Sequence, residues 1–162
     1  MKLALVAVGR SKTRFWREAQ AEYLERLRVF LPVEAYELRE ERLPPPAAPA
    51  ALHAVALRRE GTRILAQLER LSPVWAVALD VQGHLEDSPA LARRLAGWFE
   101  SGVQTLALVV GGSDGLAPEV LERCQWRWSL SPLTFPHEVA RILALEQIYR
   151  AFTLWRKLPY HR

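Results

Sequence analysis

Two short segments in the last quarter of the chain carry the residues best suited to chemistry. Residues 130–135 (Leu-Ser-Pro-Leu-Thr-Phe) are followed by Pro136 and His137, and the chain ends at residues 160–162 (Tyr-His-Arg). Because prolines keep the first segment extended or turned, its free amides and carbonyls could read the polar edge of a flat heterocycle between apolar walls. An ordinary loop that caps a helix is the alternative.

The two histidines of these segments differ in what they can do. An unperturbed imidazole has a pKa near 6.5, so the terminal His161 suits a proton acceptor at physiological pH. A terminal histidine can equally be a solvated side chain. His137 directly follows Pro136 at the start of an expected helix. Capping or a hydrogen bond to a neighbouring group is more typical of that position than proton transfer.

Two loops that could bind a ligand follow the two most clearly predicted strands. Residues 80–84 (Asp-Val-Gln-Gly-His) come after the apolar run 74–79, and residues 111–116 (Gly-Gly-Ser-Asp-Gly-Leu) come after the run 105–110. In open α/β sheets, ligands lie beyond the carboxyl ends of the strands, and glycines let a ligand approach the backbone closely. The second loop has neither the lysine of a P-loop nor the three-glycine spacing of a dinucleotide site. By itself it is also typical of a tight strand-to-helix turn.

Apolar runs that alternate with helical patterns predict the elements that must position these loops. Strands are expected at residues 3–8, 33–38, 74–79, 105–110 and 126–130. Helices are expected around residues 16–27, at 50–71 and 88–101, near Pro118 and from Pro136 onward. Ser88 is the expected N-cap of the third helix, and Gly102 lies just past its end. This order predicts an α/β domain with a mostly parallel sheet of about five strands flanked by helices.

The last predicted helix has an apolar and a basic set of residues. The apolar spacing is typical of a core helix or a subunit interface, and it includes Val139, Ile142, Leu143, Ile148, Tyr149, Phe152 and Trp155. The other face is expected to carry Arg141, Arg150, Arg156 and Lys157 with Glu138 and Glu146. From Pro136 to the end, five basic and two acidic side chains give a balance of +3. Most of the excess positive charge is therefore expected beside the predicted site.

Composition limits the remaining possibilities. A chain of 162 residues, 50% apolar and 25% charged, predicts one globular domain, residues 1–162. No apolar run reaches the length of a membrane span, and the first nine residues are typical of a strand rather than a signal peptide, so we expect a cytoplasmic protein. Cys124 is the only cysteine, which excludes an internal disulfide and a multi-cysteine metal site and favours a buried thiol. The net charge of +4 mildly favours a polyanionic partner.

Taken in order, these segments resemble the ribosomal RNA large subunit methyltransferase H family, the 23S rRNA pseudouridine N3-methyltransferases of the SPOUT or α/β-knot superfamily. The resemblance covers nearly the whole chain, and the ordered set of motifs is far more specific than any one of them. The matching motifs are Lys2-Leu3-x-Leu5-Val6-Ala7-Val8-Gly9, Leu79-Asp80-x-x-Gly83, Gly111-Gly112-Ser113-x-Gly115-Leu116, Ser129-Leu130-Ser131-x-x-Thr134-Phe135-Pro136-His137, Arg141-x-Leu143-x-x-Glu146-Gln147-x-Tyr149-Arg150-Ala151 and Tyr160-His161-Arg162.

The resemblance implies a SPOUT α/β-knot fold with a C-terminal trefoil knot, an exception to unknotted topology. It implies a homodimer in which the tail of one subunit closes the active site of the other. It also implies S-adenosyl-L-methionine as the cofactor, no metal, and methylation at N3 of a pseudouridine in 23S rRNA on the assembled ribosome. The expected cofactor-binding residues are Leu79, Gly111, Gly112, Leu130, Ser131, Pro132, Leu133, Thr134 and Phe135.

The resemblance also implies roles toward the RNA substrate. His161 would take the N3 proton or stabilise the anion that forms, Tyr160 would stack on the base, and Arg162 would hold phosphate or the anionic base edge. For Arg141, a solvated ion pair with Glu138 is the alternative to an RNA contact. The further residues expected to face the RNA are His84, His137 and Arg141.

Two departures from the family pattern concern the substrate side. Members of the family usually carry lysine at the position of His84, and many carry an acidic residue after the final arginine, where this chain stops at Arg162. Two other functions stay open. One is a ribosome-binding or RNA-binding knot protein without catalysis, and the other is a SPOUT methyltransferase that acts on tRNA. The lack of an added RNA-binding domain argues against the tRNA enzyme.

Overall fold

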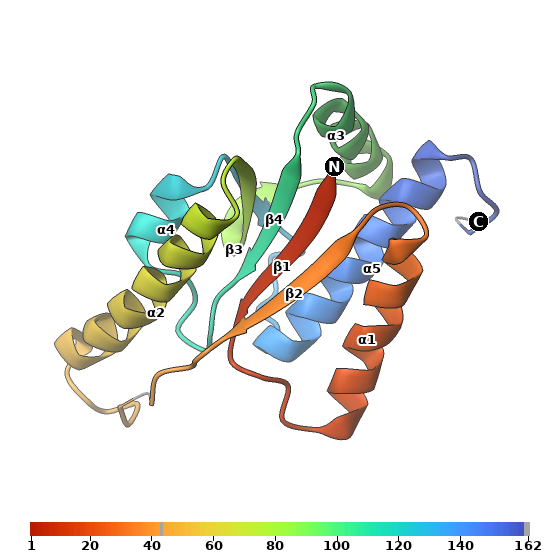
Figure 1. The fold of residues 1–162 in the computed structure, drawn as a ribbon. Helices are drawn as coiled ribbons and strands as arrows, with labels where there is room; N and C mark the ends of the chain where they lie inside the picture. The colour runs from red at the N-terminus through yellow and green to blue at the C-terminus, as the bar shows by residue number, and fades with distance from the viewer. Residues whose placement is uncertain (43, 161–162) are drawn as a thin grey trace.

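A computed structural model describes residues 1–42 and 44–160, in which strands and helices alternate along the chain (Figure 1). The strands are β1 (Lys2–Val8), β2 (Val33–Leu38), β3 (Val74–Leu85), β4 (Thr105–Val110) and β5 (Trp126–Ser129). The helices are α1 (Arg14–Arg28), α2 (Ala50–Arg70), α3 (Ser88–Glu100), α4 (Pro118–Arg123) and α5 (His137–Trp155). Each predicted strand and helix is present, which confirms the predicted α/β class.

The described strands form one parallel sheet in the order β2-β1-β4-β3-β5. β1 and β4 lie in the middle and are buried on both faces, which is why their sequences are continuous apolar runs. In β1, Leu3 and Leu5 pack with residues of α1, α3 and α5, whereas Ala4 and Val6 pack with residues of α2 and α4. Figure 1 shows these two layers of helices with the sheet between them.

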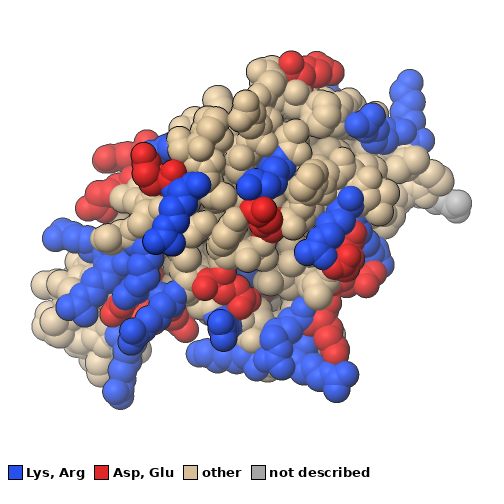
Figure 2. Space-filling model, in the orientation of Figure 1, with Lys and Arg blue, Asp and Glu red and all other residues tan. Residues whose placement is uncertain are grey.

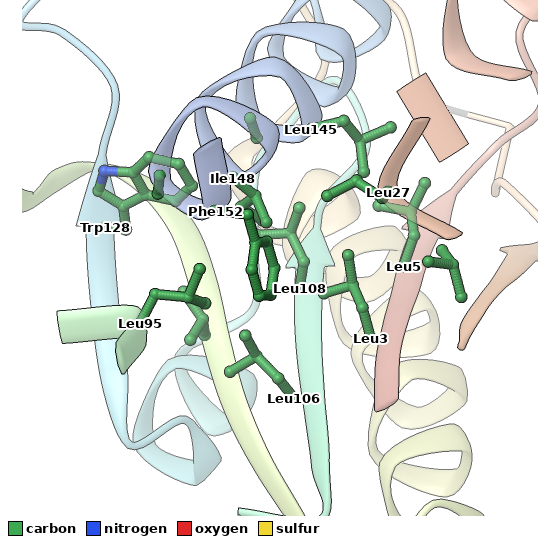
Figure 3. Packing of buried hydrophobic residues seen from close by; sticks show 14 of the residues in the cluster. Leu3, Leu5, Leu27, Leu95, Leu106, Leu108, Trp128, Leu145, Ile148 and Phe152 are labelled. Carbon is green, nitrogen blue, oxygen red and sulfur yellow. The ribbon is translucent and has the colours of Figure 1, made fainter. Parts of the chain in front are cut away.

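The larger hydrophobic core fills the space between the sheet and α5 (Figure 3). Ile148 and Phe152 of α5 point toward the sheet, where Leu108 of β4 belongs to the same cluster. Phe152 also stacks on Phe30, with 5.1 Å between the ring centroids. Burying a side chain of this size contributes about 1.5–3 kcal/mol. This packing holds α5 between α1 and α3 and places its first turn at the carboxyl edge of the sheet.

β3 is longer than the sequence predicts, because it pairs with β5 twice. It pairs with Trp128 at Leu79 and, after an irregular stretch, again at His84. The loop predicted after residue 79 is therefore part of the strand. Gly83 permits the second pairing, since a Cβ there would lie 2.7 Å from the carbonyl carbon of Arg127 and 2.8 Å from that of Trp128. The irregular stretch turns residues 80–82 toward the site described below.

The start of α3 differs by one residue from the prediction. Its N-cap is Asp87, whose carboxylate accepts a hydrogen bond of 2.7 Å from the backbone N–H of Ala90. The predicted cap, Ser88, is instead the first helical residue, followed by Pro89 in the first turn where a missing N–H costs nothing. Gly102 lies past the end of the helix with φ of +82°, as expected for a C-terminal glycine.

The single cysteine lies at the end of α4, partly buried against the second core cluster. Burial raises the pKa of the Cys124 thiol to about 11. The thiol is therefore protonated at physiological pH and unreactive as a nucleophile. This agrees with the predicted structural role for Cys124.

Candidate functional site

A hollow of about 850 Å³ lies at the carboxyl ends of β3, β4 and β5, a volume typical of small-molecule sites. Residues 79–82 of β3, residues 110–116 at and after the end of β4, and most of residues 130–137 up to the start of α5 line it. Parallel strands bring these segments together because their carboxyl ends meet at one edge of the sheet. Pro132 is not among the lining residues. The predicted cofactor-binding residues that line the hollow are Leu79, Gly111, Gly112, Leu130, Ser131, Leu133, Thr134 and Phe135.

Gly111 and Gly112 of the glycine loop, residues 111–116 after β4, leave little room for a side chain. A Cβ on Gly111 would lie 2.5 Å from the carbonyl carbon of Gly115 and 3.1 Å from the amide nitrogen of Leu116. A Cβ on Gly112 would lie 3.0 Å from Oε2 of Glu60. Gly115 has φ of +82° and donates its N–H to the carbonyl oxygen of Gly112 at 3.1 Å, which closes the turn. Backbone atoms of these glycines form this part of the wall of the hollow, and the shape of the wall depends on the absence of their side chains.

Two serine hydroxyls hold the segment between β5 and α5. Oγ of Ser129 donates to the carbonyl oxygen of Ser131 at 3.0 Å, and Oγ of Ser131 accepts from the N–H of Leu133 at 3.1 Å. These bonds take the place of helix or sheet pairing, as the prolines of the segment predict. Leu133 is exposed and Phe135 half-buried, and both line the hollow, to which they add apolar surface.

An ion pair that the sequence did not single out lies on the wall of the hollow. Nε of Arg127 donates to Oδ2 of Asp80 at 2.7 Å, and Nη2 of Arg127 donates to the same oxygen. Oδ1 of Asp80 accepts from the N–H of Gln82 at 3.1 Å. Alternation along β5 indicates only that Arg127 faces away from its tryptophan neighbours. Its partner could not be predicted, because the pair depends on the irregular stretch of β3.

A histidine of α2 ties the glycine loop to the connection that precedes α2. Nδ1 of His53 lies 2.9 Å from Oδ2 of Asp114, and Nε2 lies 3.3 Å from the carbonyl oxygen of Pro45. Both partners are acceptors, so the ring satisfies both only when each nitrogen carries a proton. The hydrogen bond that His53 donates to Asp114 is the main cause that raises the pKa of His53 above 6.5. Asp114 itself lines the hollow.

The raised pKa of His53 predicts a pH-dependent contribution to stability. A histidine whose pKa is raised on folding stabilises the folded protein below its unfolded pKa, and this contribution is lost as the pH rises through the folded pKa. A His53→Gln variant should therefore melt at a lower temperature than the parent at about pH 6, with a smaller difference at about pH 9. Thermal melts across this range check it, with a variant of exposed His84, His84→Gln, as the control. A difference that does not change with pH contradicts the prediction.

The two internal histidines expected to face RNA lie in different places. His137, the first residue of α5, lines the hollow. Burial, followed by the positive charge of Arg141, lowers the pKa of His137 below 6.5. Its ring is therefore neutral at physiological pH and suits a hydrogen bond better than an ion pair with phosphate. His84 is exposed on β3 and is not among the residues that line the hollow.

Arg141 is fully buried, so the expected RNA contact and the alternative solvated ion pair with Glu138 are both wrong. Position 141 falls on the face of α5 that packs against the sheet. Nη2 of Arg141 donates to the carbonyl oxygens of Val8 and Gly9, to the second at 3.0 Å. Nε and Nη1 have no hydrogen-bond partner among the described residues. Arg141 thus joins α5 to the end of β1 from inside the protein.

We expect Arg141→Ala to lower the free energy of unfolding by about 2–4 kcal/mol, because it leaves a cavity and unpaired backbone carbonyls in the core. Denaturant unfolding measures the change. The matched control is Arg93→Ala on the exposed side of α3, which should stay within about 0.5 kcal/mol of the parent. Equal stability of the two variants would contradict a structural role for Arg141.

The basic residues of the last helix and of the segment after it that the structure describes do not line the hollow, beside which the sequence predicted them. Arg141 is buried, and Nη2 of Arg150 pairs with Oε1 of Glu146 at 2.7 Å. Arg156 and Lys157 follow the end of α5, whereas the hollow lies at its first turn. Arg141, Arg150, Arg156 and Lys157 therefore form no positive surface at the mouth of the hollow.

Tyr160 lies at the far end of α5 from the hollow. Its ring packs edge-on against Tyr149, with 4.8 Å between the centroids, and its hydroxyl donates to Oε1 of Glu146 at 3.4 Å. Figure 1 shows the last described residues of the chain at the opposite end of α5 from its first turn. His161 and Arg162, the other predicted residues of the tail, lie outside the described residues.

Within residues 1–42 and 44–160, no group of three or more His, Cys, Asp or Glu side chains is arranged to hold a metal ion. None of the helices in this part of the chain is long and apolar enough to cross a membrane.

Solved structures of methyltransferases share the fold at low sequence identity. The probable methyltransferase from Bordetella pertussis Tohama I has a TM-score of 0.55 and 19% identity, covering 92% of this chain and 95% of that chain. The probable methylase family protein from Haemophilus influenzae Rd KW20 has a TM-score of 0.53 and 10% identity, covering 99% of this chain and 70% of that chain. These likenesses support the fold alone.

Sequence comparison is more specific. The family model described as "Predicted SPOUT methyltransferase" matches residues 1–161. The protein named ribosomal RNA large subunit methyltransferase H from Alkalilimnicola ehrlichii is 44% identical over 162 residues, which cover 100% of this chain and 99% of the relative. The protein of the same name from Bifidobacterium animalis subsp. lactis is 41% identical over 162 residues and 100% of both chains. The chain belongs to the ribosomal RNA large subunit methyltransferase H family of SPOUT methyltransferases.

Proposed function

We propose that the protein transfers a methyl group from S-adenosyl-L-methionine to N3 of a pseudouridine in 23S rRNA, on the assembled ribosome in the cytoplasm. The relatives named above are ribosomal RNA large subunit methyltransferases, which supports an RNA substrate. The observation that carries the proposal is the hollow at the carboxyl edge of the sheet. It gathers nearly all of the residues expected to bind the cofactor.

The residues around the hollow fit S-adenosyl-L-methionine. The side chains of Leu133 and Phe135 supply apolar surface of the kind that an adenine ring requires. At Gly111 an added Cβ would overlap the backbone, so the ligand meets main-chain groups there and no side chain. The cofactor supplies an electrophilic methyl group when bound. The task of the protein is to orient the cofactor and the base and to exclude water.

The proton on N3 of pseudouridine must leave as the methyl group is attached. The protein therefore has to accept this proton or stabilise the developing anion. His161 is the proposed acceptor, because an imidazole titrates near neutral pH. In the same proposal Tyr160 stacks on the base and Arg162 contacts phosphate or the anionic base edge. Of these three residues, Tyr160 alone lies within the described residues. Its ring packs against that of Tyr149 in α5 of the same chain.

The position of Tyr160 supports a site shared between two subunits. Its neighbour Tyr149 lies twelve residues after His137, which is roughly 18 Å along the helix. Tyr160 of one chain therefore lies well away from the hollow of the same chain, which favours a tail that closes the hollow of a partner.

A two-fold axis across α5 would bring each tail to the hollow of the partner. Such an axis sets the two copies of α5 antiparallel, so the end of one helix lies beside the start of the other. Half-buried apolar residues on the side of α5 that faces away from its own sheet would be covered by this contact, namely Val139, Ile142 and Leu143. We therefore include a homodimer in the proposed function. The C-terminal trefoil knot stays a prediction from the family resemblance.

Methyl transfer to ribosomes tests the proposal. The protein is incubated with ribosomes and tritium-labelled S-adenosyl-L-methionine, and the RNA is digested to nucleosides for mass spectrometry. We expect label in N3-methylpseudouridine from 23S rRNA. Label in tRNA instead would identify the tRNA enzyme. Ribosome binding without calorimetric uptake of S-adenosyl-L-methionine would identify a binding protein that has no catalytic activity.

A further inference from the structure

We infer that the connection between β1 and α1 is an RNA-binding loop, with arginines that contact phosphates and a phenylalanine that stacks on an unpaired base. This basic loop comprises residues 9–17, which are the connection after β1 together with the first turn of α1 (Arg14–Arg28). The inference rests on the proposed function, because it names the surface through which ribosomal RNA reaches the hollow. It places the RNA contact on a different part of the chain from the C-terminal basic residues.

The basic loop lies at the same edge of the sheet as the hollow. It follows the carboxyl end of β1, and ligands of open α/β sheets lie beyond that edge. The N–H of Lys12 donates to Oε1 of Glu138 at 2.8 Å, and Glu138 follows His137, which lines the hollow. Nη1 of Arg17 donates to the carbonyl oxygen of Lys12 at 3.1 Å. The loop is thus fixed to the first turn of α5 beside the hollow.

The basic loop concentrates positive charge. Residues 9–18 contain four basic side chains, from residues 10, 12, 14 and 17, and one acidic side chain, that of Glu18. The side chain of Arg10 is 84% exposed and lies 3.5 Å from Glu37, and that of Arg14 is 85% exposed and lies 2.5 Å from Glu18. Exposed ion pairs of this kind are weak, so these guanidinium groups can exchange carboxylate for phosphate. Figure 2 shows Lys and Arg side chains gathered along the lower edge of the molecule, where this loop lies in Figure 1.

An exposed aromatic ring lies among these charges. The side chain of Phe15 is 66% exposed, and its ring packs edge-on against Trp16 with 4.8 Å between the centroids. Aromatic rings beside a basic surface bind single-stranded nucleic acid, because each base offers a flat face for stacking. A face of Phe15 left open to solvent is suited to that contact.

A second group of exposed arginines lies on α2 and can be compared with the arginines of the basic loop. The side chains of Arg58 and Arg59 are 74% and 66% exposed, each near one carboxylate, as in the basic loop. The exposed large apolar side chains of α2 are the aliphatic Leu52 and Val55. These α2 residues match the basic loop in charge and exposure while differing in their apolar component. They therefore supply matched control variants.

The test uses the full-length protein with two variants, Arg10→Gln/Arg14→Gln and Phe15→Ala. Their matched controls are Arg58→Gln/Arg59→Gln and Leu52→Ala. Fluorescence anisotropy with a labelled single-stranded RNA from the methylated region of 23S rRNA measures affinity as a function of salt. We expect each loop variant to bind about tenfold more weakly at low salt, and the salt slope of the double variant to fall by about 1.4. The controls should bind like the parent.

Methyl transfer to ribosomes gives the second measurement. The loop variants should raise KM for ribosomes about tenfold and leave kcat and the calorimetric affinity for S-adenosyl-L-methionine unchanged. Loop variants that match the α2 controls in RNA affinity and in KM overturn this inference and leave the proposed function standing. A parent protein that binds RNA through the loop but transfers no methyl group overturns the proposed function and leaves the loop assignment standing.

Discussion

A Gly111→Ala protein should lose binding of S-adenosyl-L-methionine and transfer methyl groups at least about 100-fold more slowly, because a misplacement of roughly 1 Å at a site is enough for such a loss. The added Cβ would lie 2.5 Å from the carbonyl carbon of Gly115 and 3.1 Å from the amide nitrogen of Leu116. Both are backbone atoms, which cannot rotate away as a side chain could. Residues 111–116 must therefore shift together, and they form one wall of the hollow.

Three measurements separate this effect from a loss of folding. Thermal melting reports whether the variant is folded, calorimetry reports cofactor binding, and transfer of labelled methyl groups to ribosomes reports activity. The control is Gly97→Ala in α3, where a new Cβ would meet no atom of the described residues within 4 Å. It should keep both functions and gain up to about 1 kcal/mol of stability. If Gly111→Ala binds the cofactor as the parent does, the glycine loop is not part of the cofactor site.

The elements of the fold could be predicted because a strand that is buried on both faces has a continuous apolar sequence, which can be recognised in the chain. β1 and β4 are covered by helices on each side, so every position after the first residue, Lys2 or Thr105, is apolar and the runs stand out from their surroundings. β3 was predicted too short for the opposite reason. Its second half begins with Asp80 and contains Gly83, which is typical of a loop, and it is a strand only because β5 pairs with it again at His84.

The hollow could be predicted because it depends on a rule of topology. The loops after β3, β4 and β5 lie at one edge of a parallel sheet whatever their exact conformation. The contacts of single side chains could not be predicted in this way. The guanidinium of Arg141 binds the carbonyl oxygens of Val8 and Gly9, which are more than 130 residues away in the chain. Helical periodicity alone would place Arg141 on the solvent-exposed face of α5. Its burial depends on the position of the end of β1 in the folded protein, because the carbonyl oxygens there accept its hydrogen bonds.

Two inactive variants, Gly111→Ala and His161→Ala, should restore each other's activity when they form a mixed dimer. In the proposed dimer each hollow is closed by the tail of the partner. One hollow of the mixed dimer then carries both changes, while the other has an intact glycine loop and receives an intact tail. Mixed dimers isolated with two different affinity tags should therefore show about half of the parental activity.

The reverse combination distinguishes a shared site from a site within one chain. A parent subunit is paired with a subunit that carries both Gly111→Ala and His161→Ala. If tails close the hollow of the partner, the intact hollow receives a defective tail and the intact tail reaches a defective hollow, so this dimer is inactive. If each tail served its own hollow, the parent subunit would retain about half of the activity of a parent dimer, and the first pairing would give none. The two pairings have the same mutations and the same composition. A difference between them therefore reports only which subunit supplies the tail, which is the arrangement that the distance of Tyr160 from its own hollow favours.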